Sequence, residues 1–414
     1  MILRRLCTSK HYFRNTVNVK NVTNKFYSND VTSKTKRDIL DLNIRGETYS
    51  FPHVWLRDNC QCDQCFHKFA QSRIIDWSKF NLNSFPKDVV KDENSVRITW
   101  DDGHISQYTT NWLLFRSFNR DKQQYYDNYI YKPEKIVWHG KEFSKICTKH
   151  DYKAIVETDE ALYKWLYNLS TYGVALIENT PPSEHSMESI VDRIGFKKRT
   201  HYGHNFIVQN VPNTNNVAYL SSTLQLHTDL PYYEYCPGAN LLHCLVQTNS
   251  KGGENLLSDC HYTARYMKQK HPDAYKLLTE VEVEWSDIGT EQGNEFYKLH
   301  RGPVICTDKH GDITRINFSI PQRGSYLPIP IELVKPWFEA HSMFFEFNTK
   351  FSANFKTKSG DILTFDNIRL LHGRNQYKDS AENVRKLIGA YVDWDEIYSR
   401  LRCLKVKLHP ENTS

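Results

Sequence analysis

The residues of this chain whose types and spacing best suit metal chemistry are a histidine and an aspartate two positions apart, His227 and Asp229 in LQLHTDLPYYEYCPG. If the apolar run around them is a strand, both side chains leave it on the same face. A carboxylate that points into a protein interior costs free energy unless a cation or a hydrogen-bond donor pairs with it. A shared metal ion would meet that need. A structural histidine beside a hydrogen-bonded aspartate is the alternative that this fragment leaves open.

The His-x-Asp spacing is a weak signal alone, because the chain contains it three times. The copy at 271–273 encloses a proline in a lysine-rich helical stretch, which fits a surface turn. The copy at 310–312 encloses a glycine in a hairpin turn, where glycine and aspartate are common for backbone reasons. Only the copy at 227–229 lies in an apolar, strand-like segment, so it is the candidate that we pursue.

A third candidate ligand, His372, lies 145 positions after His227 (372 − 227), at the end of the apolar segment DNIRLLHGR. Two histidines and one carboxylate with open positions form the facial triad of non-haem Fe(II) oxygenases. Thirteen residues later, Arg385 opens the apolar run VRKLIGAYVDW. Arginine binds a carboxylate through two parallel hydrogen bonds, which suits the distal carboxylate of 2-oxoglutarate. The four residues together predict an oxygenase that uses Fe(II), 2-oxoglutarate and O2. A zinc hydrolase would leave Arg385 without a role.

Aromatic residues accompany this set. Strand alternation places Tyr391 on the same face as Arg385. Upstream, HYGHNFIVQNVPNTNNVAYLSST supplies Tyr202, Phe206 and Tyr219 within one short stretch. Each ring taken singly is more typical of a core residue. Several rings around one site would bind a quaternary ammonium group, which has no N–H to donate and interacts well with ring faces.

A second metal site is indicated by three cysteines in RDNCQCDQCFHK, namely Cys60, Cys62 and Cys65. Three thiolates with one further ligand bind Zn(II) tetrahedrally, and a site with no open position is structural. His67 would require one tight loop to supply all four ligands. We therefore expect the fourth ligand to be His104, one hairpin away. Three free, unligated cysteines are the alternative.

Composition and charge exclude some classes of function. The net charge is only +6, without a long basic stripe, so a nucleic-acid partner is not expected. No apolar run approaches the roughly 20 residues of a membrane helix, and we expect no membrane partner. The first 30 residues are basic and rich in hydroxyl groups, with Asp30 as their only acid. This profile is typical of a mitochondrial presequence. A disordered basic terminus is the alternative.

The pattern of apolar residues predicts the organisation of the rest. Short apolar runs separated by turns indicate a small β-rich, zinc-binding domain over 36–130, followed by a connector over 131–149. The region 150–414 begins with helical patterns and continues with turn-punctuated strands, which favours an antiparallel barrel or jelly roll with helical support. We expect helices over 158–173, 260–278 and 331–349, a hairpin over 304–318, and strands within 173–180, 360–374 and 384–394.

From about residue 36 to its end, the chain resembles the γ-butyrobetaine dioxygenase and trimethyllysine dioxygenase family of carnitine biosynthesis. The segments VWLRDNCQCDQC, NNVAYLSSTLQLHTDLPYY, GANLLHCL, GDILTFDNIRLLHGR and GAYVDWDEIYSRLR are those that carry the resemblance. The resemblance implies a mainly β double-stranded β-helix (jelly-roll) catalytic domain with supporting helices, behind a small zinc-binding domain, in a homodimer. NNVAY, LLHCLVQT and RINF are closer to the γ-butyrobetaine branch. The basic terminus suits the mitochondrial trimethyllysine branch better than the other branch, which is typically cytoplasmic.

The resemblance also implies roles for individual residues. A trimethylammonium cage would contain Phe206 where the γ-butyrobetaine branch has tryptophan, and phenylalanine is a poorer surface for a cation. The implied sets are His227, Asp229 and His372 for Fe(II); Arg385 and Leu242 for 2-oxoglutarate; Cys60, Cys62, Cys65 and His104 for Zn(II); Tyr202, Phe206, Tyr219 and Tyr391 for the cage; and Asn216 for the carboxylate end of the substrate.

We therefore expect a mitochondrial hydroxylase that converts γ-butyrobetaine to L-carnitine, with ascorbate as reductant. One alternative is 3-hydroxylation of N6-trimethyllysine. An alternative from another class is a non-catalytic module that binds methylated amines, although such a module has no use for the His–Asp–His set together with Arg385. A cytoplasmic location is the alternative to the mitochondrial one.

Overall fold

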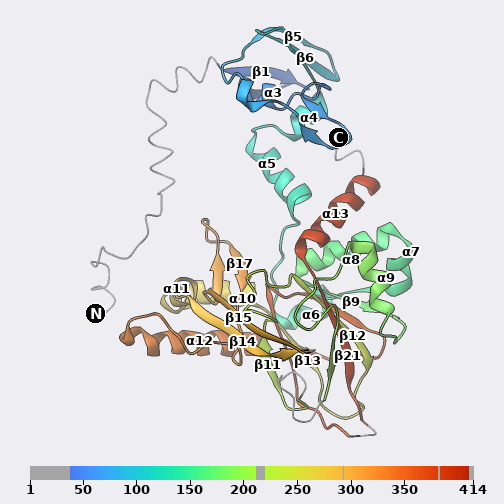
Figure 1. Cartoon of the computed structure of the whole chain (residues 1–414), viewed down its shortest axis with the longest axis vertical. Helices are drawn as coiled ribbons and strands as arrows, with labels where there is room; N and C mark the ends of the chain where they lie inside the picture. Colours follow the sequence, from blue (N-terminus) through green and yellow to red (C-terminus); the bar gives the residue numbers. More distant parts are fainter. Residues whose placement is uncertain (1–37, 211–219, 292, 381–382, 410–414) are drawn as a thin grey trace. The chain divides into compact units, whose positions relative to one another are not determined.

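The computed structural model describes four stretches of the chain, residues 38–210, 220–291, 293–380 and 383–409. The chain divides into two compact units between Tyr129 and Ile130 (Figure 1). Among the described stretches, no helix combines the length and the apolarity that crossing a bilayer requires.

Small antiparallel sheets form most of the first unit. In the segment SVRITW every second residue is apolar, and Val96, Ile98 and Trp100 are accordingly buried with Phe51 and Tyr108 in a core of this unit's own. The unit contains strands β1 Ile39–Ile44, β2 Glu47–Pro52, β3 Phe66–His67, β4 Ser72–Arg73, β5 Pro86–Lys91, β6 Ser95–Trp100 and β7 Ile105–Thr109, and helices α3 His53–Asp58, η2 Trp77–Lys79, α4 Thr110–Phe115 and α5 Arg120–Tyr126. The π-helix η3, Asp127–Tyr131, spans the division between the units.

Two sheets form the centre of the second unit. Their strands are β8 Thr148–Asp151, β9 Val174–Glu178, β10 Phe206–Gln209, β11 Leu224–His227, β12 Ala239–Val246, β13 Asn255–Asp259, β18 Ala353–Phe355, β19 Ile362–Asp366, β20 Leu370–Arg374 and β21 Lys386–Val392. The larger sheet has the order β10-β21-β12-β19-β9-β8, and the smaller one has the order β11-β20-β13-β18. All neighbours are antiparallel except β8 and β9. The expected jelly roll is confirmed.

The middle strands of the larger sheet are buried on both faces. Leu241, Ile388 and Ala390 pack into an apolar cluster with Trp165 and Leu401 of the covering helices. Because side chains alternate along a strand, Asn240, Gly389 and Tyr391 point to the opposite face, into the interior of the jelly roll. The covering and connecting helices are η4 Gly140–Glu142, α6 Phe143–Ile146, α7 Tyr152–Glu157, α8 Asp159–Tyr172, α9 Ser186–Ile194 and α13 Trp394–Leu408.

The predicted helices are present, with one difference. The pattern over 260–278 forms two helices, α10 Cys260–Lys270 and α11 Pro272–Glu280, because Pro272 lacks an N–H and occupies the first position of the second helix. The His-x-Asp copy at 271–273 therefore lies at a helix junction. The helix α12, Ile331–Phe351, spans the third predicted segment.

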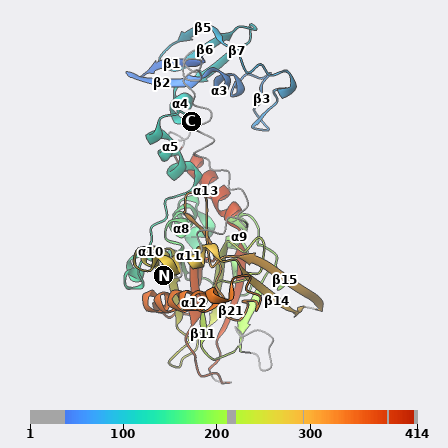
Figure 2. The ribbon, with the colours of Figure 1, turned by 90° about the vertical axis from the view of Figure 1, so that its left-hand side faces the viewer.

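Two hairpins complete the second unit. The pair β16 Ile305–Thr307 and β17 Ile313–Ile316 is the predicted hairpin over 304–318, and the copy of His-x-Asp at 310–312 forms its turn. The longer pair, β14 Val283–Glu291 and β15 Asn294–Gly302, extends outward from the sheets as a two-stranded ribbon (Figure 2). The base of this ribbon is fixed by Trp285, which is fully buried in a second apolar cluster with Phe318 and Trp337.

Candidate metal centre and ligand cavity

His227 and Asp229 reach the interior by different means. Strand β11 ends at His227, so the expectation that a strand carries both residues is wrong. The chain turns instead: the Thr228 N–H donates to the Phe318 carbonyl (2.7 Å), and Leu230 has a left-handed backbone (φ 55°). Asp229 is fixed by Asn367, whose Oδ1 accepts from the Asp229 N–H (2.7 Å) and whose Nδ2 donates to its carbonyl (2.9 Å).

His372 completes a three-residue cluster. It lies in β20 directly opposite His227 in the strand ladder, and the two ring centroids are 4.3 Å apart. Oδ1 of Asp229 lies 3.3 Å from Nε2 of each histidine. One ligand atom from each residue lies within 4.8 Å of the others. The structure therefore brings together the three residues that the sequence predicted, in an arrangement that fits one metal cation.

The electrostatics of the cluster suit a cation. Burial alone would raise the pKa of Asp229, but the neighbouring imidazoles of His372 and His227 hold it well below its usual range. The carboxylate is therefore ionised. Nδ1 of His227 lies 2.8 Å from the Gln225 carbonyl, and since only an N–H can pair with a carbonyl, Nδ1 carries a hydrogen and Nε2 is the ring nitrogen that faces Asp229.

The second carboxylate oxygen of Asp229 has separate partners. Nδ2 of Asn240 donates to Oδ2 at 2.6 Å, and the hydroxyl of Tyr391 donates to the same oxygen at 3.0 Å. Sequence reasoning missed Asn240 and Asn367. A signal existed for Asn240, because it is the single amide in the largely apolar strand segment GANLLHCL.

A cavity of about 260 Å³ opens beside the cluster. Tyr202, Phe206 and Tyr391 line it together with His227 and Asp229. The ring of Phe206 stacks on Tyr391 with centroids 5.0 Å apart, and Tyr202 lies 6.3 Å from Phe206.

The ring of Phe206 also lies on Gly389 of the neighbouring strand. A Cβ at position 389 would approach the Phe206 ring to 2.1 Å, so the absence of a side chain there is what gives this ring its place. Asn216 and Tyr219, the other two predicted ligand-binding residues, lie outside the described residues.

Arg385 lies just before β21 and is 3% exposed. Its strongest described contact is a long one, 3.5 Å from Nη2 to Oδ1 of Asn255, and its Nε has no hydrogen-bond partner among the described residues. Burial lowers the pKa of Arg385 to about 10, and the charge of Arg374 adds to this effect. A buried guanidinium with unused donors fits an anionic ligand.

Leu242 lies between the metal cluster and this arginine. On the inner face of β12 it follows Asn240, which contacts Asp229, and precedes Cys244. Burial raises the pKa of the Cys244 thiol to about 11, and the nearby charge of Arg385 acts against that rise. The inner face of β12 thus runs from the three-residue cluster to the buried guanidinium, with Leu242 in the middle.

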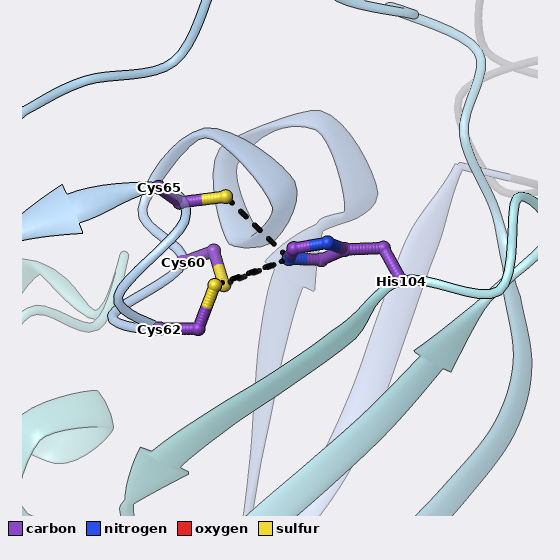
Figure 3. Close-up of side chains that lie close together, drawn as sticks. All are labelled: Cys60, Cys62, Cys65 and His104. Carbon is purple, nitrogen blue, oxygen red and sulfur yellow. Dashed lines mark hydrogen bonds between the residues drawn. The ribbon is translucent and has the colours of Figure 1, made fainter.

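In the first unit, the side chains of Cys60, Cys62 and Cys65 converge on that of His104 (Figure 3). Nε2 of His104 lies 3.2 Å from Sγ of Cys60 and 3.5 Å from Sγ of both Cys62 and Cys65. The four ligand atoms lie within 4.8 Å of one another. Burial raises the pKa of Cys60 to about 12, so a cation is needed to hold this sulfur as a thiolate near neutral pH.

His67 is not part of this group. Its ring is turned to the surface, where Nδ1 accepts from the Ala70 N–H at 3.0 Å. The donor set of three sulfurs and one imidazole nitrogen is the set that tetrahedral Zn(II) takes in structural sites.

Comparison with known proteins supports both units. Residues 139–391 match the family described as taurine catabolism dioxygenase TauD, TfdA family, and residues 31–114 match the gamma-butyrobetaine hydroxylase-like N-terminal domain. Gamma-butyrobetaine dioxygenase of Homo sapiens is 35% identical over 364 residues, which cover 87% of this chain and 93% of the relative. Mitochondrial trimethyllysine dioxygenase of Mus musculus is 29% identical, over 96% of this chain and 93% of the relative. Gamma-butyrobetaine dioxygenase of Pseudomonas sp. (strain AK-1) is 28% identical, over 87% and 92%.

Proposed function

Because the chain belongs to the taurine catabolism dioxygenase TauD, TfdA family and is therefore a 2-oxoglutarate-dependent dioxygenase, we propose that it hydroxylates γ-butyrobetaine to L-carnitine. The observation that carries this proposal is the cavity whose walls combine two members of the His–Asp–His cluster, His227 and Asp229, with three aromatic rings. A cluster of that kind suits Fe(II), and rings of that kind suit a trimethylammonium group.

We assign Fe(II) to His227, Asp229 and His372. The bound metal supplies the redox chemistry in which O2 and 2-oxoglutarate become succinate and CO2 while one C–H bond of the substrate becomes C–OH. The chain's own contribution is positional. Asp229 provides the negative charge, and the two imidazoles provide neutral nitrogens whose orientation is set by Gln225 and by the strand ladder of β11 and β20.

We assign the distal carboxylate of 2-oxoglutarate to Arg385. Its unused Nε donor and its burial support this role, since a desolvated guanidinium binds a carboxylate more strongly than an exposed one. Leu242 would then contact the carbon chain of the cosubstrate between the metal cluster and the guanidinium.

We assign the trimethylammonium group to Tyr202, Phe206, Tyr219 and Tyr391, and the substrate carboxylate to Asn216. Fixing both ends of the substrate leaves only one C–H bond near the metal, and such positioning is what makes the reaction selective. The stacked pair Phe206 and Tyr391 supports the position of the cage next to Asp229.

The test is a substrate panel with purified protein, Fe(II) and 2-oxoglutarate, in which succinate release and the mass of the hydroxylated product are both followed. We expect product from γ-butyrobetaine, and none from its neutral tert-butyl analogue, which has the same shape without the charge. Product only from N6-trimethyllysine would favour the alternative activity, 3-hydroxylation of N6-trimethyllysine. The similarity to trimethyllysine dioxygenase over 96% of the chain supports this alternative. Turnover of neither amine would contradict the proposal.

We propose a structural Zn(II) on Cys60, Cys62, Cys65 and His104, within a zinc-binding domain over 36–130 that a connector over 131–149 joins to the catalytic domain over 150–414. The converging sulfur and nitrogen atoms support the zinc site. Ascorbate as the reductant that keeps iron in the ferrous state is part of the same proposal. It is tested by turnover number per enzyme with and without ascorbate.

We also propose that the protein is a mitochondrial homodimer, on the basis of its family and its acid-poor first 30 residues. Relatives named as mitochondrial trimethyllysine dioxygenase support the location. Light scattering of the purified chain tests the oligomeric state. A fluorescent protein fused after residues 1–30 tests the location, and a cytoplasmic signal would contradict the mitochondrial assignment.

A further inference from the structure

The two oxygens of the Asp229 carboxylate have different surroundings. Oδ1 faces Nε2 of both histidines at 3.3 Å, whereas Oδ2 accepts hydrogen bonds from Asn240 and Tyr391 at 2.6 and 3.0 Å. A carboxylate oxygen that receives two donors has little free electron density for a metal. Only Oδ1 is left to act as a metal ligand.

The two donors are held rigidly. Asn240 and Tyr391 are direct partners in the ladder between β12 and β21, and their side chains are 0% and 3% exposed. The amide of Asn240 must present Nδ2, because a carboxylate can only accept. Since Asn367 also fixes the backbone of Asp229 from both sides, this carboxylate cannot rotate without breaking buried hydrogen bonds.

We propose that Asn240 and Tyr391 are positioning residues that keep Asp229 a one-oxygen ligand, and that Tyr391 links the metal centre to the aromatic wall of the cavity. The inference rests on the proposed function, in which iron needs open positions for a chelating cosubstrate and O2. If Oδ2 were free, the carboxylate could bind through both oxygens and occupy one of those positions. The hydroxyl of Tyr391 prevents this while its ring, stacked on Phe206, lines the ligand cavity.

The test uses metal binding, which needs no turnover. Tyr391→Phe keeps the ring and removes the donor, and Asn240→Leu removes the other donor at similar volume. Loss of a hydrogen-bond partner of a metal ligand typically weakens metal binding about 10- to 100-fold. We expect this loss for Co(II) in each variant under anaerobic conditions, together with a change in the Co(II) visible spectrum toward a higher coordination number.

A matched control is Tyr233→Phe, which removes a hydroxyl that bonds to His201 (2.9 Å) rather than to the metal carboxylate. It should leave the Co(II) affinity and spectrum within twofold of the wild-type values. Thermal unfolding of each variant shows that it is folded.

Unchanged Co(II) affinity and spectrum in both variants would overturn the inference. A merely structural role for these residues would lower the unfolding temperature without changing the spectrum, and this result would overturn it as well. Failure of the proposed function gives a different result: the Co(II) effects persist, but the wild-type protein turns over no trimethylammonium substrate.

Discussion

The guanidinium of Arg369 and the carboxylate of Asp259 form a two-point ion pair in which both side chains are fully buried, with Nε–Oδ1 and Nη2–Oδ2 distances of 3.1 and 2.8 Å. Arg369 also donates to the carbonyls of Thr171 and Ile136, and Asp259 accepts from the Trp138 N–H. The pair therefore ties the start of β20, the strand of His372, to the segment around Trp138.

Breaking this pair should be costly. In Arg369→Met the Asp259 carboxylate would remain buried without its cation, and losses of this kind are about 3–5 kcal/mol in the free energy of unfolding. Urea denaturation measures the loss. The control is Lys335→Met, whose exposed partner Glu339 lies 3.9 Å away, and which should cost less than about 1 kcal/mol. Equal losses in the two variants would show that the buried pair is not specially stabilising.

The zinc site offers a comparison between two histidines close to the same cysteines. His104→Ala removes a predicted ligand and should abolish or strongly reduce bound zinc after dialysis, because three thiolates alone leave a tetrahedral position open. His67→Ala should keep the wild-type zinc content, since its ring is bonded to Ala70 at the surface. Elemental analysis measures both. Loss of zinc in the His67 variant would contradict the assignment of His104 as the fourth ligand.

The contact between Phe206 and Gly389 should set the affinity for a trimethylammonium ligand. Gly389→Ala would place a methyl group in the Phe206 ring and displace it, weakening binding several-fold, in line with about 0.5–2 kcal/mol for a cation–π contact. If the effect acts through that ring, Gly389→Ala should add little in a Phe206→Ala background. Calorimetric titration of the four combinations measures the coupling. Additive effects would mean that Gly389 acts elsewhere.

Substitution of Arg385 should affect the cosubstrate selectively. Arg385→Ala removes charge-assisted hydrogen bonds of about 1.5–3 kcal/mol each, so the KM for 2-oxoglutarate should rise at least tenfold while the KM for the amine changes little. Arg385→Lys should recover only part of the loss, because an ammonium cannot form the paired contact. Initial rates with each substrate varied in turn measure this. Equal changes in both KM values would place Arg385 outside the cosubstrate site.

Stability should fall in acid partly through His341. Burial lowers its pKa from 6.5 to about 4, with a smaller effect from the charge of Arg323, so the folded state keeps the imidazole neutral. As the pH falls from 6.5 to 4, the unfolded chain takes up a proton that the folded chain does not, and stability decreases. In His341→Gln the dependence of the unfolding free energy on pH in this window should be shallower than in the wild-type protein. Denaturant titrations at several pH values measure the slopes.

Residue types and spacing were sufficient to predict much of the candidate site. The choice of 227–229 among three His-x-Asp copies followed from the apolar residues around it, and His372 and Arg385 followed from their places at the ends of apolar runs. The structure places the first three of these residues in one cluster and buries the fourth. The preference for His104 over His67 followed from one argument, that a single tight loop would have to supply all four ligands if His67 were the fourth.

The rest depends on contacts that a single sequence does not display. The end of β11 at His227 is set by hydrogen bonds from Thr228 to Phe318 and from Asp229 to Asn367, which lie about a hundred residues away. The same is true of Asn240. Its amide can donate to the Asp229 carboxylate only because the fold brings β12 next to Asp229. The jelly roll itself was predictable because strand alternation is local, whereas the choice of which polar groups meet inside it is not.

The direct pairing of His227 with His372 in one strand ladder has a consequence for the stage at which the three-residue cluster can form. These positions meet only after the chain has closed a long loop and docked its last strands, and Asp229 is held by a residue of the turn between β19 and β20. A nascent or half-assembled polypeptide consequently lacks the proposed pocket for a reactive metal. Under the proposed assignment of Fe(II) to these residues, the complete site can form only in a chain that contains β20.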